Sequence, residues 1–418
     1  MRLSVHPALL GLLALVAGLC LPIVLHRGET SYTADETRFY VPAIAQLRAE
    51  WPRFDLQRDS LSATAPGYQY VLATLSLLTG PDLIRLRLLN LAVSLGVLVV
   101  VWQVWARDAA GMGRFAALLP LACCNFFIKS AGCVVTDNAA LLGIAGTLVL
   151  GLTVQEKSTL TWAGVTTTLA VFFRQNTAWL ELPLLVRVWR TGRLRAGWPL
   201  LLPAGLLLWL VVTWGGLVPP AWQEQHSGRI VFAAGAYHLA VLAIMGPFYL
   251  AAIRPAWRQV AREPWAWWGA LLGLLLAVAG PTDPSYDAGR WGGYLWNMAE
   301  RLPLIADRSI LFLLLAPLGG FVLGWLIRAL WTTAERERGL IWIGAQIAFL
   351  VSGLVNRQVY HRYFEPPQLV LLILWLALMA RARPADAAPF QWRPLLLLGA
   401  GQLAVTLITA YGRTYHWL

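Results

Sequence analysis

Charged residues are scarce in this sequence. Asp, Glu, Lys and Arg make up 13% of its 418 residues, whereas a soluble domain carries about 25%. Hydrophobic residues make up 58%, and the mean hydropathy is +0.60. Together these values exclude a soluble enzyme, a disordered tail and a coiled coil, and they indicate one integral membrane unit.

Cysteine, lysine and nucleotide-binding motifs are also rare or missing. The 4 cysteines lie in apolar runs, no CxxC pair occurs and the histidines are scattered, which argues against a disulfide framework or a zinc site. No GK[ST] loop supports ATP-driven transport, and no evident internal repeat supports an inverted-repeat transporter. Among 33 basic residues only Lys129 and Lys157 are lysines, a bias typical of a GC-rich bacterial genome.

Apolar runs long enough to cross a bilayer dominate the chain. A spanning helix needs about 20 apolar residues, with a range of about 17–25. The first run directly follows Met1 and Arg2 but shows no small-residue cleavage site, so we interpret it as a retained helix rather than a signal peptide. Including short runs that borrow flanking residues, we predict about thirteen spans: Pro7–Leu25, Leu88–Trp105, Phe115–Val135, Ala139–Val154, Leu160–Phe173, Thr177–Trp189, Trp198–Leu217, Ile230–Ile253, Trp265–Gly280, Ile310–Ile327, Leu340–Val355, Pro366–Ala380 and Leu395–Tyr411.

The weaker apolar run Tyr68–Leu78 decides the orientation of every later span. If it does not cross, the side of the N-terminus holds 17 of the 33 basic residues and only 6 of the 21 acidic ones. Cytoplasmic loops show this bias, and it accounts for the net charge of +12 without a nucleic-acid partner. We therefore predict a cytoplasmic N-terminus, an external C-terminus, and a Tyr68–Leu78 helix that lies on or dips into the outer face.

The longest loop, residues 26–87, follows the first span and carries two adjacent acids. Thr33 with Glu36 three residues later is a capping-box pattern, which predicts a helix starting near Ala34. Glu36 is then either a helix cap or a catalytic carboxylate. Asp35 has no capping role and lies in the first turn of a helix at the membrane interface, so it is our preferred catalytic carboxylate.

In this topology, further polar residues fall on the same external face. Asp137 begins a tight turn, which is either turn chemistry or part of a site. The triplet Arg174, Gln175 and Asn176 brings a guanidinium and two amides to one point. That set suits a phosphate or a sugar, and the alternative is a clamp between helices. Because independent loops need not share chemistry, we predict one extracytoplasmic site built from several loops.

Two later external loops add arginines, aromatic rings and glycines. Asp287 and Arg290 stand among tyrosine, tryptophan and glycine, a composition that either stacks on sugars or forms an interfacial belt. Arg357, His361 and Arg362 fall within six positions of each other. Arginine pairs bind phosphate bidentately, and a solvated loop is the alternative.

These residues resemble the GT-C superfamily of membrane glycosyltransferases, whose members carry an essential acid in the first external loop. The similarity extends to the α-1,2-glucosyltransferases that add the last glucose to a lipid-linked oligosaccharide. The chain departs from that family in the spacing after its Asp-Glu pair, in a missing histidine and in the loss of an Asn-Arg-His order. The resemblance is carried, in the family's order, by Asp35-Glu36-Thr37-Arg38-Phe39-Tyr40-Val41-Pro42, Pro66-Gly67-Tyr68-Gln69-Tyr70, Leu86-Arg87-Leu88-Leu89-Asn90, Phe173-Arg174-Gln175-Asn176-Thr177-Ala178-Trp179, Asp287-Ala288-Gly289-Arg290-Trp291 and Arg362-Tyr363-Phe364-Glu365-Pro366.

The resemblance implies an all-α polytopic membrane protein. One domain over residues 1–418 would form a GT-C-like bundle of about thirteen transmembrane helices, with interfacial helices in the first extracytoplasmic loop. Its activity would be the inverting transfer of a hexose, glucose favoured, from a polyprenyl-phosphate donor to a lipid-linked or surface-glycan acceptor. The alternatives are a lipid-linked glycan ligase or polymerase and a lipid or sugar transporter. A transporter should place its charges near the membrane midplane, whereas here they gather at one face.

The same resemblance assigns roles to residues and partners. The catalytic carboxylates are Asp35, as the base for the acceptor hydroxyl, and Glu36. Donors with a lipid monophosphate are generally used without a metal in this superfamily, so we expect no metal and no cofactor. The expected partners are the bilayer, the donor and a glycan or glycolipid acceptor, at a bacterial plasma membrane with the site facing the periplasm or exterior. The candidate substrate-binding residues are Arg362, Arg290, Arg174, Arg357, Gln175, Asn176, His361, Asp287 and Asp137.

Overall fold

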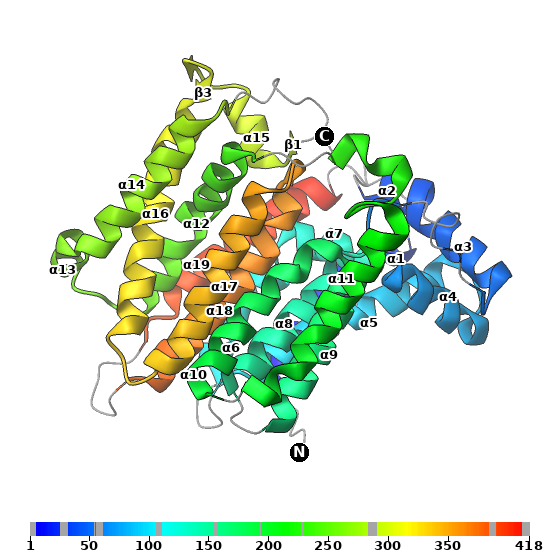
Figure 1. The fold of residues 1–418 in the computed structure, drawn as a ribbon. Coiled ribbons are helices and arrows are strands. Elements are labelled where there is room, and N and C mark those ends of the chain that lie inside the picture. Colours follow the sequence, from blue (N-terminus) through cyan, green and yellow to red (C-terminus); the bar gives the residue numbers. More distant parts are fainter. Residues whose placement is uncertain are drawn as a thin grey trace. The chain divides into compact units, whose positions relative to one another are not determined.

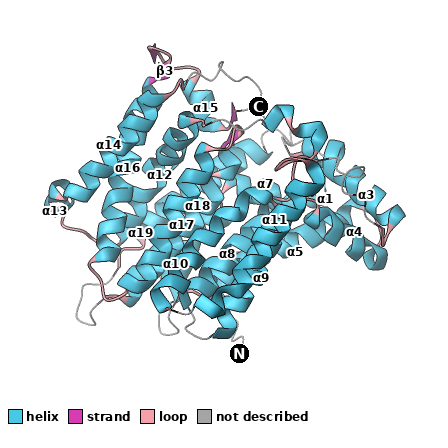
Figure 2. Ribbon diagram, in the orientation of Figure 1, coloured by secondary structure: helices cyan, strands magenta, loops and turns pink. Residues whose placement is uncertain are grey.

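A computed structural model describes residues 6–25, 32–53, 55, 62–105, 111–153, 157–192, 194–226, 230–282, 291–383 and 390–411. This described part is almost entirely helical, with four strands of two residues each (Figures 1 and 2). It divides into two compact units: unit 1 is Met1–Gln225 with Gly399–Leu418, and unit 2 is His226–Leu398. Each unit is described by itself, and the single domain over residues 1–418 stays a prediction.

Unit 1 is a bundle in which consecutive long helices lie antiparallel. Arg87, near the start of α5, donates to the carbonyl oxygen of Ile23, near the end of α1, at 2.9 Å. The start of α5 is fixed by Asp82, whose carboxylate accepts the N–H groups of Ile84 and Arg85 as an N-cap. The helices of unit 1 are α1 Pro7–Leu25, α2 Thr33–Asp35, the π-helix η1 Glu36–Tyr40, α3 Val41–Glu50, α4 Gly67–Thr79, α5 Leu83–Trp102, α6 Gly111–Ala122, α7 Asn125–Gly132, α8 Asp137–Thr153, α9 Lys157–Phe173, η2 Gln175–Leu180, α10 Glu181–Thr191, η3 Leu194–Leu200, α11 Leu201–Trp214, η4 Pro220–Trp222 and, after Gly399, the remainder of α19 Arg393–Thr406 with η8 Leu407–Tyr411.

The predicted third span is broken into two helices. α6 and α7 meet at an angle of 72°, because Cys124 between them adopts an extended conformation. The last carbonyl groups of a helix lack partners within it. At the end of α7, the side-chain amide of Asn90 donates to the carbonyl oxygens of Ser130 at 2.5 Å and Cys133 at 2.7 Å. A side chain of α5 therefore satisfies carbonyl groups at the end of α7.

The run Tyr68–Leu78 forms a helix, as predicted. It is α4, with 13 residues, and at 1.5 Å per residue it is about 20 Å long, shorter than a hydrocarbon core of about 30 Å. Gly67 at its start touches α9 so closely that a Cβ there would lie 2.2 Å from the ring of Phe172. Glycine is required at this position for steric reasons, and the contact fixes the start of α4 against the bundle.

Unit 2 is built around two buried helices, α12 and α18, which the other helices cover. In each of them, 83% of the most apolar 18-residue stretch is buried, whereas in α1 of unit 1 the buried share is 33%. Two short strand pairs complete the unit, β1 with β4 in parallel and β2 with β3 in antiparallel orientation. The elements of unit 2 are α12 Phe232–Ala252, α13 Trp257–Arg262, α14 Pro264–Ala279, β1 Trp291–Gly292, α15 Tyr294–Ala299, β2 Leu304–Ile305, β3 Arg308–Ser309, α16 Ile310–Trp331, α17 Arg336–Leu354, β4 Val359–Tyr360, η7 His361–Tyr363, α18 Glu365–Arg381 and the start of α19.

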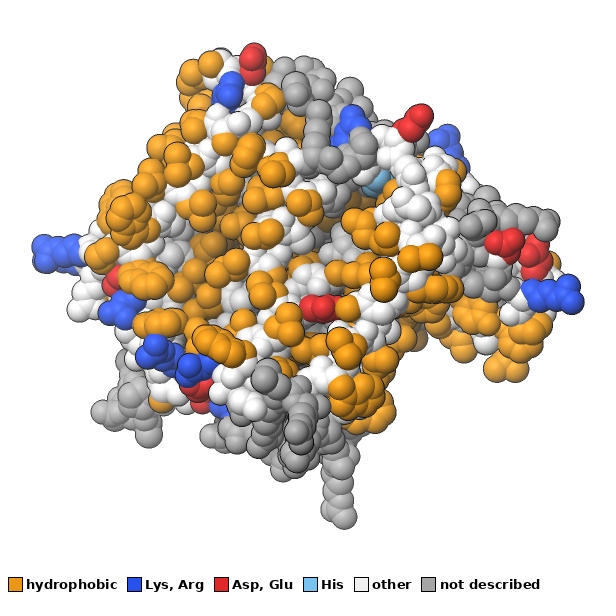
Figure 3. Space-filling view, in the orientation of Figure 1, with side chains coloured by type: hydrophobic (Ala, Val, Ile, Leu, Met, Phe, Trp, Pro, Cys, Tyr) orange, Lys and Arg blue, Asp and Glu red, His pale blue; other side chains and the backbone are white. Residues whose placement is uncertain are grey.

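α14 and α16 pack with their backbones in contact. A Cβ on Gly320 would lie 2.0 Å from the carbonyl oxygen of Gly269, and a Cβ on Gly273 would lie 2.1 Å from that of Ala316. Small residues at such spacing let membrane helices approach closely. Hydrophobic side chains cover the visible surface of these two helices, and charged side chains lie near α13 and near the β2–β3 hairpin (Figure 3).

The helices confirm an integral, multi-pass membrane protein. Within the described residues, seven helices are long and apolar enough to cross a membrane, or eight if the bent pair α6 and α7 counts as one span. Three shorter apolar helices, at Asp137–Leu152, Thr159–Phe173 and Pro264–Ala279, coincide with further predicted spans. The total of about thirteen spans stays a prediction.

Candidate active site

The two adjacent acids of the first loop lie on one continuous helical stretch in unit 1. α2, η1 and α3 follow one another from Thr33 to Glu50 without a break, and Glu36 to Tyr40 form a π-helical turn. Such π-turns are rare and often occur at functional sites. Within the turn, Glu36 and Tyr40 are buried, whereas Asp35 and Phe39 are half-buried. The stretch therefore has one face toward the bundle and one partly open face.

Glu36 belongs to a buried ion pair. Its carboxylate accepts Arg87 Nε at 2.9 Å and Arg87 Nη2 at 2.5 Å, and it also accepts the backbone N–H of Val134 at 2.7 Å. The side chains of Glu36 and Arg87 are 0% and 2% exposed. The predicted helix starts within one residue of Ala34, at Thr33, but the capping box is wrong, because Tyr32 precedes the helix without a side-chain cap. Glu36 instead joins the first-loop helix to α5 and to the segment after α7.

Asp35 has a different environment from its neighbour. It is half-buried, whereas Glu36 is fully buried. Phe39, one turn later, packs edge-on against Trp222 of η4, with ring centroids 5.3 Å apart. The carboxylate of Glu36, by contrast, is enclosed by Arg87 and Val134.

Asp137 and Arg174 form an ion pair at the same end of unit 1. Asp137 is the first residue of α8, and Arg174 stands in an extended conformation between α9 and η2. Their carboxylate and guanidinium groups are in contact, and each side chain is 11% exposed. Tyr40 of the first-loop helix lies 3.4 Å, hydroxyl to hydroxyl, from Thr136 next to Asp137. These contacts bring the first loop and the start of α8 together, as the predicted topology requires.

Gln175 acts as a clamp, the alternative that the sequence left open. Its amide nitrogen donates to the carbonyl oxygen of Ala63 at 2.8 Å, and its amide oxygen accepts the N–H of Ala65 at 2.7 Å. Those residues precede α4, so Gln175 fixes the end of the first loop. Asn176 is exposed, and it is the member of the triplet that is open to a ligand.

Unit 2 contains a separate group of predicted residues around β4. His361 is 1% exposed; its Nδ1 lies 2.6 Å from the hydroxyl of Tyr237, and its Nε2 lies 2.8 Å from a carboxylate oxygen of Glu365. The hydroxyl of Tyr294 donates to the same Glu365 oxygen at 2.5 Å. His361, predicted as a substrate ligand, is therefore enclosed by protein groups.

The glycines next to this group serve protein packing. A Cβ on Gly293, whose φ is +124°, would lie 2.3 Å from the Cβ of His361, and a Cβ on Gly292 would lie 2.7 Å from the ring of Tyr360. The sequence left open whether this composition of glycines and aromatic rings stacks on a sugar or forms an interfacial belt. The structure shows instead that β4 and η7 approach these glycines.

Arg362 and Arg357 are the half-buried arginines of this region. The Arg362 guanidinium lies 5.4 Å from the ring centroid of Tyr360 and 5.1 Å from that of Tyr363, and Nη2 donates to the Tyr363 hydroxyl at 3.1 Å. Two aromatic rings thus orient one planar guanidinium, and this geometry suits a bidentate contact with a phosphate. Asp287 and Arg290 lie outside the described residues.

Several framework residues went unrecognised in the sequence. Arg87, Asn90 and Tyr68 lie in matched motifs but were not proposed as site residues; Tyr68 donates to Asn90 in the interior of unit 1. Glu365 and Tyr237 in unit 2 were also missed. A buried charge within an apolar run is the signal that identifies Arg87, because such residues are costly unless paired.

The part of the chain that the structure describes contains no cluster of potential metal ligands. Within it, no three His, Cys, Asp or Glu side chains gather as ligands. Metal independence stays a prediction.

Comparisons with known proteins give a limited result. No family model matches the chain, and no curated protein matches its sequence. Among solved structures, the crystal structure of ArnT from Cupriavidus metallidurans in the apo state is similar, with a TM-score of 0.47 and 15% sequence identity. The similarity covers 96% of this chain and 65% of that protein. A likeness at this level does not assign a function.

Proposed function

We propose that the chain is an inverting glycosyltransferase. It moves a hexose, glucose favoured, from a polyprenyl-phosphate donor to a hydroxyl of a lipid-linked or surface glycan at the extracytoplasmic face. The observation that carries this proposal is the contrast between two adjacent carboxylates: Glu36 is buried and bound by Arg87, whereas Asp35 is half-buried. A general base must reach its substrate, and Asp35 meets that requirement.

The reaction is a single displacement at the anomeric carbon. The acceptor oxygen attacks C1 of the sugar, the bond from C1 to the phosphate oxygen breaks, and its electron pair leaves with the lipid phosphate. Asp35 takes the proton of the acceptor hydroxyl as the new bond forms. Attack from the side opposite the leaving group inverts the configuration at C1. No covalent sugar–protein intermediate is formed.

The leaving phosphate gains negative charge, and arginines stabilise it. Arg362 is the first choice because Tyr360 and Tyr363 orient its guanidinium, and preorganised donors lower the barrier without reorganisation. Arg357 is the second choice. Arg174 falls in rank because Asp137 already neutralises its charge, and Arg290 keeps the role that the family resemblance implies. Asn176, being exposed, contributes an amide to the sugar or the acceptor.

The proposal is tested with purified protein and a synthetic polyprenyl-phosphate-glucose. The expected products are free polyprenyl phosphate and an acceptor one hexose heavier, detected together by mass spectrometry. Surface glycans from a strain that lacks the gene should each be one hexose shorter. Loss of whole glycan chains from the cell surface would favour the ligase or polymerase instead. Unchanged glycans, with no release of polyprenyl phosphate in vitro, would refute the proposed function.

A further inference from the structure

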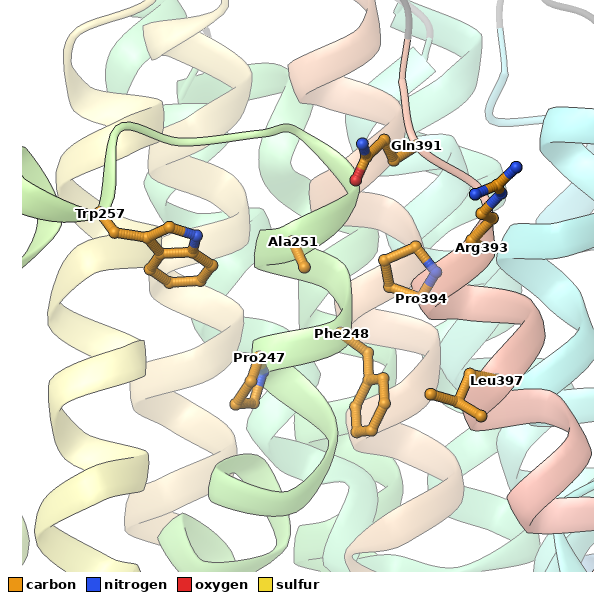
Figure 4. Close-up of a pocket in the computed structure, with 8 residues that line it drawn as sticks. All are labelled: Pro247, Phe248, Ala251, Trp257, Gln391, Arg393, Pro394 and Leu397. Atoms are coloured by element: carbon orange, nitrogen blue, oxygen red, sulfur yellow. The ribbon is translucent and has the colours of Figure 1, made fainter.

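An amphipathic groove lies at the end of unit 2 that is remote from His361. It has a cavity volume of about 600 Å³ and runs between α12, the start of α13 and the start of α19. Figure 4 shows Gln391 and Arg393 toward one end of the groove and Phe248 and Leu397 toward the other. The groove thus combines an apolar channel with a cationic, hydrogen-bonding mouth.

The groove is separate from the residues proposed for catalysis. Tyr237, which contacts His361, is near the start of α12, and Ala252 at its end accepts the backbone N–H of Gln391 at 2.9 Å. Fifteen residues of helix separate the two contacts, about 22 Å along the axis. A ligand in the groove therefore does not occupy the surroundings of His361.

Both helices that form the groove walls are long and apolar enough to span a membrane, and the groove lies at their shared end. Leu397 is 66% exposed and Trp257 is 55% exposed. Exposed apolar side chains on such helices face lipid, and tryptophan marks the level of the headgroups. The groove therefore opens where acyl chains meet headgroups.

Positive charge accumulates at this end of unit 2. Arg254, Arg258 and Arg262 follow α12, and Arg393 begins α19. Within the described residues no carboxylate pairs with Arg393, whereas Glu263 lies 3.5 Å from Arg328. Burial and the nearby charge of Arg254 lower the pKa of the Arg383 guanidinium. A cation at the start of a helix opposes the helix dipole, so an anion there would stabilise the arrangement.

We infer that this groove binds an anionic phospholipid of the surrounding leaflet. One acyl chain lies along Phe248 and Leu397, and the phosphate accepts hydrogen bonds from the Arg393 guanidinium and the Gln391 amide. The N-terminus of α19 adds the positive end of its dipole to the same phosphate. Arginines near a membrane surface attract anionic lipids by about 1 kcal/mol each, and the apolar channel distinguishes a lipid from a free anion. The inference does not depend on the proposed transferase activity.

The test measures lipid binding to purified protein by native mass spectrometry and by thermal unfolding in detergent. Phosphatidylglycerol should bind and raise the unfolding temperature, and phosphatidylcholine should do so much less. Arg393→Gln should weaken phosphatidylglycerol binding by roughly tenfold or more, as the loss of a charge-assisted hydrogen bond predicts. Ala251→Trp, which fills the channel, should abolish the lipid effect. Arg262→Gln is the matched control, because Arg262 is exposed at the same end but does not line the groove.

Three results would overturn the inference. Equal effects of the two lipids on the wild type would remove the selectivity for an anion. Equal losses in Arg393→Gln and Arg262→Gln would mean diffuse surface attraction rather than a site. Stabilisation by inorganic phosphate alone as strong as that by phosphatidylglycerol would identify a free-anion site. Without lipid, all three variants should unfold at the wild-type temperature, and a lower value would disqualify that variant as a probe of binding.

Discussion

Asp35 and Glu36 are adjacent in sequence, and their surroundings determine what each substitution should do. Asp35→Asn keeps the size and hydrogen bonding of the side chain but removes the base. A positioned general base contributes typically about 10²–10⁴-fold to the rate, so single-turnover transfer should fall by that range. Donor binding should barely change, because the base contacts the acceptor. The measurement is transfer and donor binding on one preparation, and an Asp35→Asn protein with full turnover would remove Asp35 from the mechanism.

Glu36→Gln should act on folding. Removing one partner of a buried ion pair costs roughly 3–5 kcal/mol, because the other charge remains buried without compensation. The unfolding temperature should therefore drop. Changing Arg87→Met in the same protein should recover part of the loss, since neither charge is then left alone. If Glu36→Gln instead unfolds like the wild type and has lost transfer, Glu36 is the catalytic carboxylate.

Arg362 should affect donor binding and turnover together. Arg362→Ala removes a phosphate partner in both the ground state and the transition state, and a charge-assisted hydrogen bond is worth roughly 1.5–3 kcal/mol. Donor affinity should thus fall by about 10–100-fold, with a further fall in turnover. Arg362→Lys should restore only part of both, because an ammonium cannot form the bidentate contact. Unchanged donor affinity in Arg362→Ala would exclude a phosphate-binding role.

At the residue scale, the sequence identifies the polar residues at the ends of apolar runs, but it does not identify their partners or roles. Asp35, Glu36, Asp137 and Arg174 stand out as polar residues at the ends of apolar runs, and the structure brings the last two into contact. The partner of Glu36 lies 51 residues away, so the local capping pattern pointed to the wrong partner. Long-range ion pairs leave no local pattern, and the fold is needed to identify them.

At the scale of helices, the contact between α14 and α16 gives a stability prediction. Gly320→Ala places a methyl group against the backbone of Gly269, and overpacking of this kind costs typically about 1–3 kcal/mol. Gly205→Ala in α11 is the matched control, because a Cβ there meets nothing within 4 Å. That control should be neutral or more stable by up to about 1 kcal/mol, since alanine favours a helix over glycine. Thermal unfolding of both variants checks this, and equal values would contradict the packing argument.

Helix breaks were only partly predictable. The polar triplet at Arg174 ended α9 as expected, because it interrupts an apolar run. The bend at Cys124 was not expected, because the apolar run continues on both sides and Asn125 is the one polar residue next to it. The carbonyl group of Cys123 at the bend accepts the hydroxyl of Thr406, which lies on another helix. Hydropathy measures the apolar character of a segment, and continuity of the helix depends on such tertiary contacts.

At the scale of the whole molecule, the charge distribution predicts the orientation in the membrane. Ala221→Cys should react with an impermeant thiol reagent in intact cells, whereas Ala334→Cys should react only after permeabilisation. Both positions are exposed, and the four native cysteines are buried, so background labelling should be low. The opposite pattern would show that the run Tyr68–Leu78 crosses the bilayer.

The two ends of the chain meet in unit 1. The Thr406 hydroxyl of α19 donates to the carbonyl oxygen of Cys123 at 2.6 Å, the Thr409 hydroxyl of η8 donates to the Asn125 side chain at 2.6 Å, and the Tyr411 hydroxyl donates to the carbonyl oxygen of Leu19. Synthesis proceeds at about 5–20 residues per second, so a ribosome that has finished the first part of unit 1 needs roughly 10–35 s more to translate unit 2. During that interval α1 and α7 lack their contacts with α19 and η8. A premature stop codon after Leu398 would thus damage the unit that was translated first.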